Sequence, residues 1–164
     1  MNRMWSWTSA VILAGLMVWV WAYPKFWAGL EVHPVFKWSE LLSGHAFIDP
    51  YARWVVGAVA LVSVAMLFIN RTRLIGAGIA AGLSVFYLVL HATPWLGMAI
   101  PTYETLSAGL AAGMTPEQIR AAGRLDDVHV VMTLVNGLLA IVIISAELSL
   151  RREAETARLG RFAY

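Results

Sequence analysis

Four long apolar segments constrain the fold of this chain more than any other feature of its sequence. They cover about residues 5–27, 50–69, 74–94 and 128–150, close to the roughly 20 residues that a helix needs to cross a bilayer core. Helices suit lipid because their backbone polar groups are satisfied internally. Composition agrees, since 60% of residues are hydrophobic and 13% are charged. We therefore predict an all-α, single-domain integral membrane four-helix bundle surrounded by a lipid bilayer.

The connections between the four segments differ in length. Asn70-Arg71-Thr72-Arg73 is short enough for a tight turn, which predicts that the second and third helices form an antiparallel hairpin. Two long loops, at about residues 31–49 and 93–127, join the other helices. In the second loop, a threonine, a proline and a glutamate predict the start of a short surface helix at about residues 116–122.

The distribution of Lys and Arg predicts the orientation of the bundle in the membrane. One end carries seven of these residues: Arg3, Arg71, Arg73, Arg151, Arg152, Arg158 and Arg161. The other end carries five, diluted over the long loops: Lys25, Lys37, Arg53, Arg120 and Arg124. We therefore expect a multi-pass protein of the bacterial inner membrane, with both termini in the cytoplasm and both long loops outside it. No basic cluster suggests a nucleic-acid partner.

Small residues mark one stretch of the third helix. Gly78 and Gly82 are four positions apart, and Gly76 extends the pattern. Small residues let two helix backbones approach closely in lipid. The pattern fits either a homodimer or packing inside the bundle, and we favour packing inside the bundle for Gly76, Gly78 and Gly82.

Polar residues form a stripe on each of the last two helices. Each stripe keeps a helical spacing of three and four, so its members share a face. The stripes are Ser84, Tyr87 and His91 on the third helix, and His129, Thr133 and Asn136 on the fourth. In each, the deepest residue lies seven positions, or about 10 Å, below the histidine. Because the helices are antiparallel, facing stripes would form a polar slot open toward the outer leaflet.

Three interpretations of this slot stay open. The side chains can simply hydrogen-bond between helices, which is common in membrane bundles. They can bind a quinone or another amphipathic headgroup through His91, Tyr87 and Asn136, since these groups donate and accept hydrogen bonds. Finally, His91 and His129 can ligate haem or another metal, although no histidine pair has a recognised metal-binding spacing. The cofactor is therefore unknown, with quinone favoured over haem or metal.

Charged residues near the helix ends have ordinary structural interpretations. Glu147 and Arg151 are four positions apart near the end of the fourth helix, which predicts a surface ion pair. Lys25, near the end of the first helix, is expected to extend its ammonium group to the membrane interface. Tryptophans near the predicted helix ends, including Trp27, fit an aromatic belt at the headgroup level.

Short motifs resemble the DoxX and DoxX-like family of small four-helix membrane proteins. They are Tyr23-Pro24-Lys25-Phe26, Asp49-Pro50, Gly57, the stretch from Asn70 to Ala77, and His91. The resemblance implies a membrane component linked to quinone oxidoreductases. Two features depart from the family pattern: an acidic residue often found shortly after the glycine of helix two is absent, and the loop before helix four is long.

These observations lead to three functional hypotheses. The first is an accessory, non-catalytic subunit that packs against a larger quinone-linked electron-transfer or energy-converting complex. The second is a redox subunit that interacts with quinone, haem or metal through the polar slot. The third is a small transporter or channel, which the near absence of charge in the helix interiors disfavours. The sequence contains no complete catalytic motif, and we expect no catalysis by this chain alone.

Overall fold

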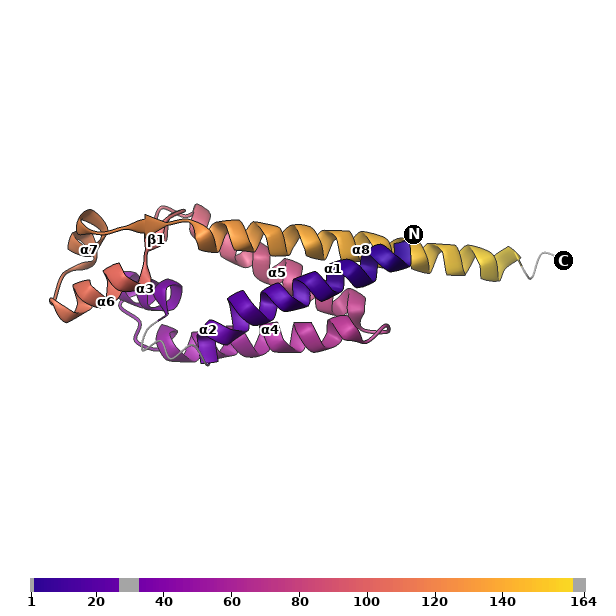
Figure 1. The fold of residues 1–164 in the computed structure, drawn as a ribbon, viewed down its shortest axis with the longest axis horizontal. Helices are drawn as coiled ribbons and strands as arrows, with labels where there is room; N and C mark the ends of the chain where they lie inside the picture. Colours follow the sequence, from indigo (N-terminus) through magenta and orange to yellow (C-terminus); the bar gives the residue numbers. More distant parts are fainter. Residues whose placement is uncertain (1, 27–32, 161–164) are drawn as a thin grey trace.

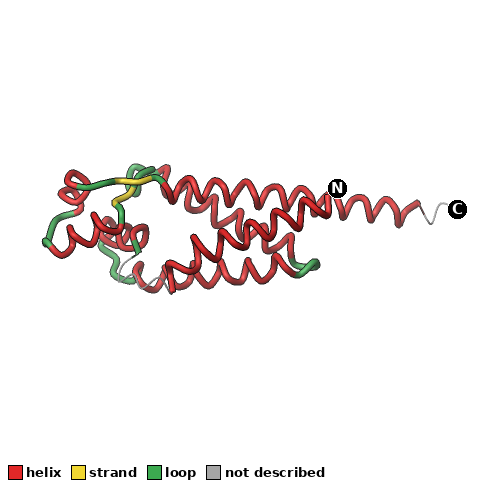
Figure 2. The backbone as a smooth tube through the Cα atoms, in the orientation of Figure 1, coloured by secondary structure: helices red, strands yellow, loops and turns green. Residues whose placement is uncertain are grey.

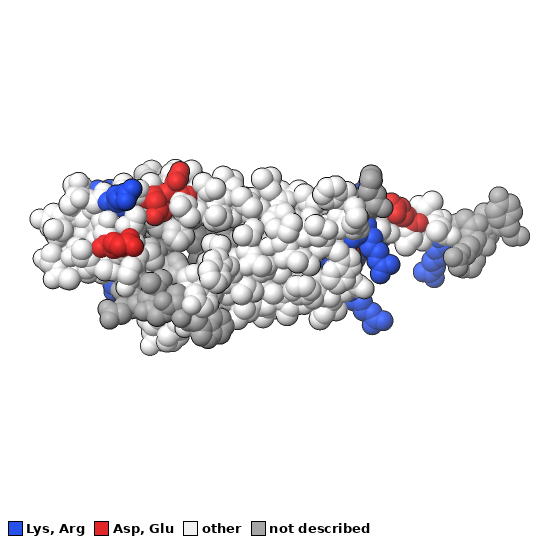
Figure 3. All heavy atoms as spheres, viewed as in Figure 1, with Lys and Arg blue, Asp and Glu red and all other residues white. Residues whose placement is uncertain are grey.

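Four helical spans dominate the computed structural model, which describes residues 2–26 and 33–160 (Figure 1). Within those residues, the segments long and apolar enough to cross a membrane are Arg3–Phe26, Ile48–Phe68, Arg73–Ala92 and Val128–Leu159. On the face drawn in Figure 3, charged side chains lie toward the two ends and leave an uncharged band between them. The prediction of an all-α protein with four membrane-spanning helices is confirmed.

The first span is one helix with a wider turn near its end. It consists of α1 (Asn2–Leu16), a π-helical segment η1 (Met17–Ala22) and α2 (Tyr23–Phe26). Pro24 explains the change, because proline has no N–H and its ring crowds the preceding turn. In η1 the N–H of Tyr23 donates to Val18 O, five residues back, which is the hydrogen bond of a π-turn. The predicted end at Trp27 lies outside the described residues.

The second and third spans form the predicted hairpin. A π-helical turn η2 (Ile48–Ala52) leads into α4 (Arg53–Phe68), and a tight turn connects α4 to α5 (Arg73–Ala92). Thr72 closes this turn, since its hydroxyl donates to Met66 O at 3.1 Å. The last span, α8 (Val128–Gly160), runs past the predicted end at Leu150 and extends beyond the rest of the bundle (Figure 1).

The long loops contain helices that cover one end of the bundle, here called the cap end (Figure 2). The predicted surface helix is present as α7 (Pro116–Ala122). Two further helices, α3 (Pro34–Ser43) and α6 (Tyr103–Ala111), were not predicted. A two-residue antiparallel pairing joins β1 (Ile100–Pro101) to β2 (Leu125–Asp126). The opposite end, which carries both termini and the α4–α5 turn, is called the hairpin end.

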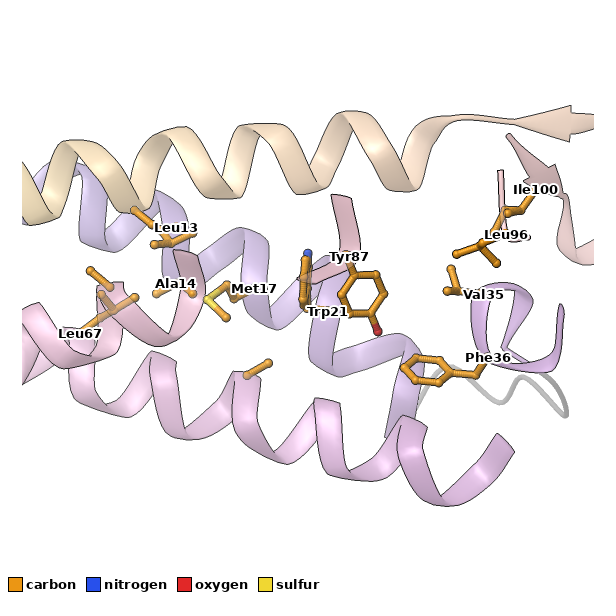
Figure 4. Packing of buried hydrophobic residues seen from close by; sticks show 14 of the residues in the cluster. Leu13, Ala14, Met17, Trp21, Val35, Phe36, Leu67, Tyr87, Leu96 and Ile100 are labelled. Atoms are coloured by element: carbon orange, nitrogen blue, oxygen red, sulfur yellow. The ribbon is translucent and has the colours of Figure 1, made fainter. Parts of the chain in front are cut away.

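The four spans form a closed ring around a continuous core. Helix α8 packs against both α1 and α5, α5 packs against α4, and α4 contacts η1. The core runs along the bundle axis and continues under the cap helices (Figure 4). Leu13, Met17 and Ala60 are fully buried or nearly so in its middle. Side chains from all four spans therefore fill the centre of the bundle.

The three glycines of α5 lie in different surroundings, which corrects the prediction that all three pack inside the bundle. A Cβ at Gly76 would lie 2.8 Å from Ser63 O and 2.9 Å from Met66 Cβ, so only glycine allows α4 this close. A Cβ at Gly78 or Gly82 would meet nothing within 4 Å. Gly78 and Gly82 are therefore on the outward side of α5, because its buried side follows other positions of the helical repeat.

An ion pair is buried where α1, α5 and α8 meet at the hairpin end. Arg73 is 2% exposed, and its Nη1 lies 3.1 Å from Glu147 Oε1. The Ser6 hydroxyl donates to the same carboxylate oxygen. Arg73 Nε donates to Leu67 O at 2.8 Å, and its guanidinium lies 3.7 Å from the centre of the Trp7 ring. The pair therefore links α8 to α1 and to the α4–α5 hairpin.

This contact corrects the predicted pairing of Glu147 with Arg151. Glu147 faces the interior of the bundle, whereas Arg151 is exposed on the extension of α8. Helical spacing shows that the two residues are neighbours on one helix. It cannot show that a buried arginine from another helix provides a partner in a less polar environment.

We predict that Glu147→Leu destabilises the bundle by about 3–5 kcal/mol, because Arg73 would remain buried without its carboxylate. Arg151→Met is the matched control and should change stability little. Unfolding of the purified protein in a mixed micelle, followed by circular dichroism, measures both variants. Equal effects of the two substitutions would show that the buried pair does not stabilise the fold.

Candidate functional site

A small cavity lies at the cap end of the bundle, between the end of the first span, the start of α3, α5 and α8. We call it the polar chamber. Its lining residues are Val20, Trp21, Lys25, His33, Val35, Tyr87, His129 and Thr133. The space open to the centre of a water molecule is about 20 Å³. That volume is sufficient for a single water-sized group.

Lys25 provides an ammonium group to this chamber. Its side chain is buried rather than extended to the interface, which corrects the prediction from its position near a helix end. Nζ lies 5.6 Å from the ring centre of Trp21 and 5.7 Å from that of Phe36, within range of cation–π attraction. Within residues 2–26 and 33–160, no carboxylate forms an ion pair with Lys25.

His33 and His129 both line the chamber and lie close to each other, with their ring centres 6.0 Å apart. The backbone N–H of His33 donates to Asp49 Oδ2 at 3.2 Å, and Asp49 Oδ1 pairs with Arg53 Nε at 3.0 Å. Burial lowers the pKa of His33 well below 6.5, and the positive charges of Lys25 and Arg53 lower it further. His33 is therefore neutral at physiological pH in a region of positive potential.

Tyr87 forms one wall of the chamber. Its ring packs edge-on against Trp21, with 4.8 Å between ring centres, and lies beside it in Figure 4. The Tyr87 hydroxyl is buried and has no hydrogen-bond partner among the described residues. Thr133 differs, because its hydroxyl donates to His129 O at 2.7 Å. The chamber thus contains an unused donor at Tyr87.

The structure brings together three of the six polar residues singled out from the sequence. Tyr87, His129 and Thr133 line the polar chamber, whereas Ser84, His91 and Asn136 do not. Helices α5 and α8 do face each other, since a Cβ at Gly137 would lie 3.3 Å from Ser84 Cβ. The chamber is nevertheless completed by η1, α2 and α3, which the two stripes did not include.

The other three stripe residues are buried in separate environments. The Ser84 hydroxyl donates to Ala80 O in its own helix at 2.9 Å. His91 Nδ1 donates to Gly97 O at 2.8 Å, which leaves Nε2 as a buried acceptor without a partner in the described chain. The Asn136 side-chain amide is also buried without a described partner. His91 and Asn136 therefore have hydrogen-bonding atoms that no described residue satisfies.

Two observations concern the haem and metal hypotheses: the size of the polar chamber and the grouping of side chains that could bind a metal. His129 lines the polar chamber and His91 does not, and a chamber of about 20 Å³ cannot accommodate a porphyrin. No group of three or more His, Asp or Glu side chains with the geometry of a metal site occurs within the described ranges. Neither ligand set therefore gains support from the arrangement of the side chains.

A second, apolar pocket lies next to the polar chamber and shares Val35 and Tyr87 with it. Its space for water-sized centres is about 220 Å³. Its other lining residues are Phe36, Ser39, Ile48, Ala52, Val56, Phe86, Leu90 and Trp95. The pocket thus lies between α3, the start of α4 and the end of α5. Tyr87 borders a polar space on one side and an apolar space on the other.

Sequence reasoning missed Lys25 and His33 as members of the site. One signal was available for each residue. Pro24 alters the helix just before Lys25, which changes the direction of the following side chain. Pro34 occupies the first turn of α3, and Gly44 ends it in a left-handed conformation with φ of 72°, so a cap helix directly after His33 was predictable.

No protein-family model, curated protein or solved structure matches this chain.

We predict that His33 makes folding sensitive to acid. Its pKa in the folded protein is below the unfolded value of 6.5. As pH falls below 6.5, the unfolded chain binds a proton that the folded chain resists, so stability decreases by up to about 1.4 kcal/mol per pH unit. His33→Gln should reduce this slope, while His45→Gln, at an exposed position, should retain it. Denaturant midpoints between pH 7.5 and 5 measure the slopes, and an unchanged slope in His33→Gln would contradict the assignment.

Proposed function

We propose that this chain is an accessory membrane subunit that packs against a larger quinone-linked electron-transfer or energy-converting complex. The observation that carries this proposal is the outward side of α5, where a Cβ at Gly78 or Gly82 would contact nothing in the chain. Small residues on a lipid-facing helix allow another transmembrane helix to approach closely. This side of α5 is therefore our candidate for the contact with the partner.

The interior of the bundle supports a non-catalytic role. Leu13, Met17 and Ala60 fill its middle, and the polar chamber, with about 20 Å³ open to water-sized centres, is too small for a metabolite. Substrate pockets commonly occupy about 300–1,000 Å³. Chemistry on a metabolite is therefore better assigned to the partner than to this chamber.

The quinone-linked context rests on the resemblance to the DoxX family. Tyr23-Pro24-Lys25-Phe26 and the stretch from Asn70 to Ala77 carry that resemblance. In this structure the first motif places Lys25 in the polar chamber, and the second contains both Arg73 and Gly76. The motifs thus coincide with residues that organise the two ends of the bundle.

We predict that Gly82→Leu weakens co-purification with the partner complex at least tenfold, because a leucine side chain would separate the two helix backbones. Ala58→Leu, on the exposed side of α4, is the matched control and should co-purify normally. Affinity purification from native membranes in a mild detergent, with mass spectrometry of the bound proteins, measures both. Recovery of this chain only as a monomer or a homodimer would overturn the proposal.

We also propose that the protein resides in a bacterial inner membrane with the hairpin end in the cytoplasm. The support is the Lys and Arg bias, seven residues at the hairpin end against five at the cap end. Arg71 at the hairpin end is exposed in the short α4–α5 turn. Lys and Arg in short loops are expected to remain on the cytoplasmic side.

Single-cysteine labelling tests this orientation cleanly, since the chain contains no cysteine. In intact spheroplasts, a membrane-impermeant maleimide should label Ala112→Cys at the cap end and should not label Arg71→Cys. Opening the membrane should expose both cysteines to the reagent. The reverse pattern in intact cells would invert the proposed topology.

A second candidate is a quinone-interacting subunit, which the apolar pocket specifically favours. Its volume of about 220 Å³ is ring-sized, and Tyr87 borders it. The buried Tyr87 hydroxyl provides an unused hydrogen-bonding group beside an apolar space, the combination that an amphipathic ring requires. This candidate places the ring between α3, α4 and α5, not between the two polar stripes.

For this candidate we predict that quinone co-purifies with the protein and that Val56→Phe reduces it at least fivefold by filling the pocket. Val55→Phe adds the same ring on the exposed side of α4 and is the control. Solvent extraction followed by chromatography quantifies quinone per protein. The candidate fails if extracts contain no quinone above the detergent blank, or if both variants retain it equally.

A further inference from the structure

Hydrogen-bond donors surround the polar chamber in excess over acceptors. Lys25 brings an ammonium group with three donors, and the Tyr87 hydroxyl is buried without a described partner. His33 Nδ1 is also buried without a described partner. Thr133, by contrast, already donates to a backbone carbonyl. Two residues that line the chamber, Lys25 and Tyr87, therefore carry hydrogen-bond donors, and the Tyr87 hydroxyl has no described partner.

The charged side chains around the chamber are mainly cationic. Lys25 and Arg53 are both buried cations, and Asp49 is paired with Arg53 through a 3.0 Å contact. Asp126 is the other carboxylate near His129, but it does not line the chamber, and its Oδ1 accepts from the Val128 N–H. A buried charge without a partner is costly. The ammonium group of Lys25 therefore needs a counter-charge, and no described carboxylate pairs with it.

We propose that the polar chamber binds a small monovalent anion, a carboxylate group or a halide, held by the Lys25 ammonium group and the Tyr87 hydroxyl. The anion neutralises the charge of Lys25 and accepts hydrogen bonds from its ammonium group and from the Tyr87 hydroxyl. His33 and His129 complete the lining of the chamber. This site does not depend on the partner complex proposed above.

The size of the chamber selects among anions. A space of about 20 Å³ for water-sized centres fits a chloride ion or the head of a carboxylate. Sulfate and phosphate carry more oxygens than the chamber can enclose and a second charge that a single ammonium group does not balance. The expected order of binding therefore places formate and chloride ahead of sulfate.

Two sources could supply a carboxylate, because the chamber borders the apolar pocket. Formate or a similar free anion would occupy the chamber alone. A fatty acid would place its carboxylate in the chamber and the start of its acyl chain in the apolar pocket of about 220 Å³, past Val35 and Tyr87. Both sources use the same chemistry at Lys25, and they differ in their use of the pocket.

Thermal unfolding of the purified full-length chain in detergent tests the proposal. Formate or chloride is titrated at constant ionic strength, with sodium sulfate as the balancing salt. At saturation we expect formate and chloride to raise Tm by about 5 °C, because a ligand of the folded state stabilises it by mass action. No rise in Tm with either anion would overturn the proposal.

Two variants connect the rise in Tm to the chamber. Lys25→Met should abolish it, and Tyr87→Phe, which removes only the unpartnered hydroxyl, should raise the half-saturating formate concentration about tenfold. Lys37→Met removes a cap-end lysine that pairs with Glu40 and should leave the titration unchanged. If Lys25→Met does not fold, comparing the formate titration of Tyr87→Phe with that of Lys37→Met still tests the site. Equal titrations in Tyr87→Phe and the wild-type chain would overturn the site.

Two further experiments identify the anion. Laurate, kept below its micelle concentration, should half-saturate at least tenfold below formate if a fatty acid is the ligand, and Val56→Phe should remove that difference. Equal half-saturation of laurate and formate indicates a free anion; either result supports the chamber. Glu31 lies outside the described residues, and its carboxylate is an internal alternative. A formate effect that appears only in Glu31→Gln would overturn binding of an external anion.

Discussion

The absence of water from the hydrocarbon core of a bilayer governs this structure. Every backbone N–H and C=O inside the membrane needs a partner within the protein, which restricts each crossing to a helix. The same constraint applies to buried polar side chains, whose unmet hydrogen bonds are costly. At the hairpin end the fold meets it, because Arg73, Glu147 and Ser6 from three helices bond with one another. At the cap end the Tyr87 hydroxyl is buried without a described partner, and no described carboxylate pairs with Lys25.

This difference between the two ends separates their roles. The Arg73 cluster links the hairpin to the first and last helices and uses its charges internally, as a structural contact does. The polar chamber concentrates charge and donors without matching acceptors, which is the arrangement of a binding site. Between them the core is closed by Leu13, Met17 and Ala60, so the buried charges do not form a continuous polar path across the bundle. The hypothesis of a transporter or channel gains no support from this arrangement.

The proposed roles use different surfaces of the same small bundle. The outward side of α5 with Gly78 and Gly82 is available to a partner helix, and the apolar pocket is available to a ring or an acyl chain. Tyr87 lies on the wall between that pocket and the polar chamber, so a ligand in one space adjoins the groups of the other. The proposed accessory subunit would therefore hold ligands beside its partner and leave the chemistry to that partner.

The four spans, the tight α4–α5 hairpin and the short helix α7 could be predicted from sequence, because hydrophobic length and capping residues act locally. The polar stripes also identified Tyr87, His129 and Thr133 as residues that would share a site. Only the tertiary structure decided the partners. The rotation of each helix in the bundle buried Glu147 beside Arg73 instead of Arg151, turned Gly78 and Gly82 outward, and brought Lys25 and His33 to the chamber. Such rotations depend on packing between residues far apart in the chain, which the periodicity of a single helix does not contain.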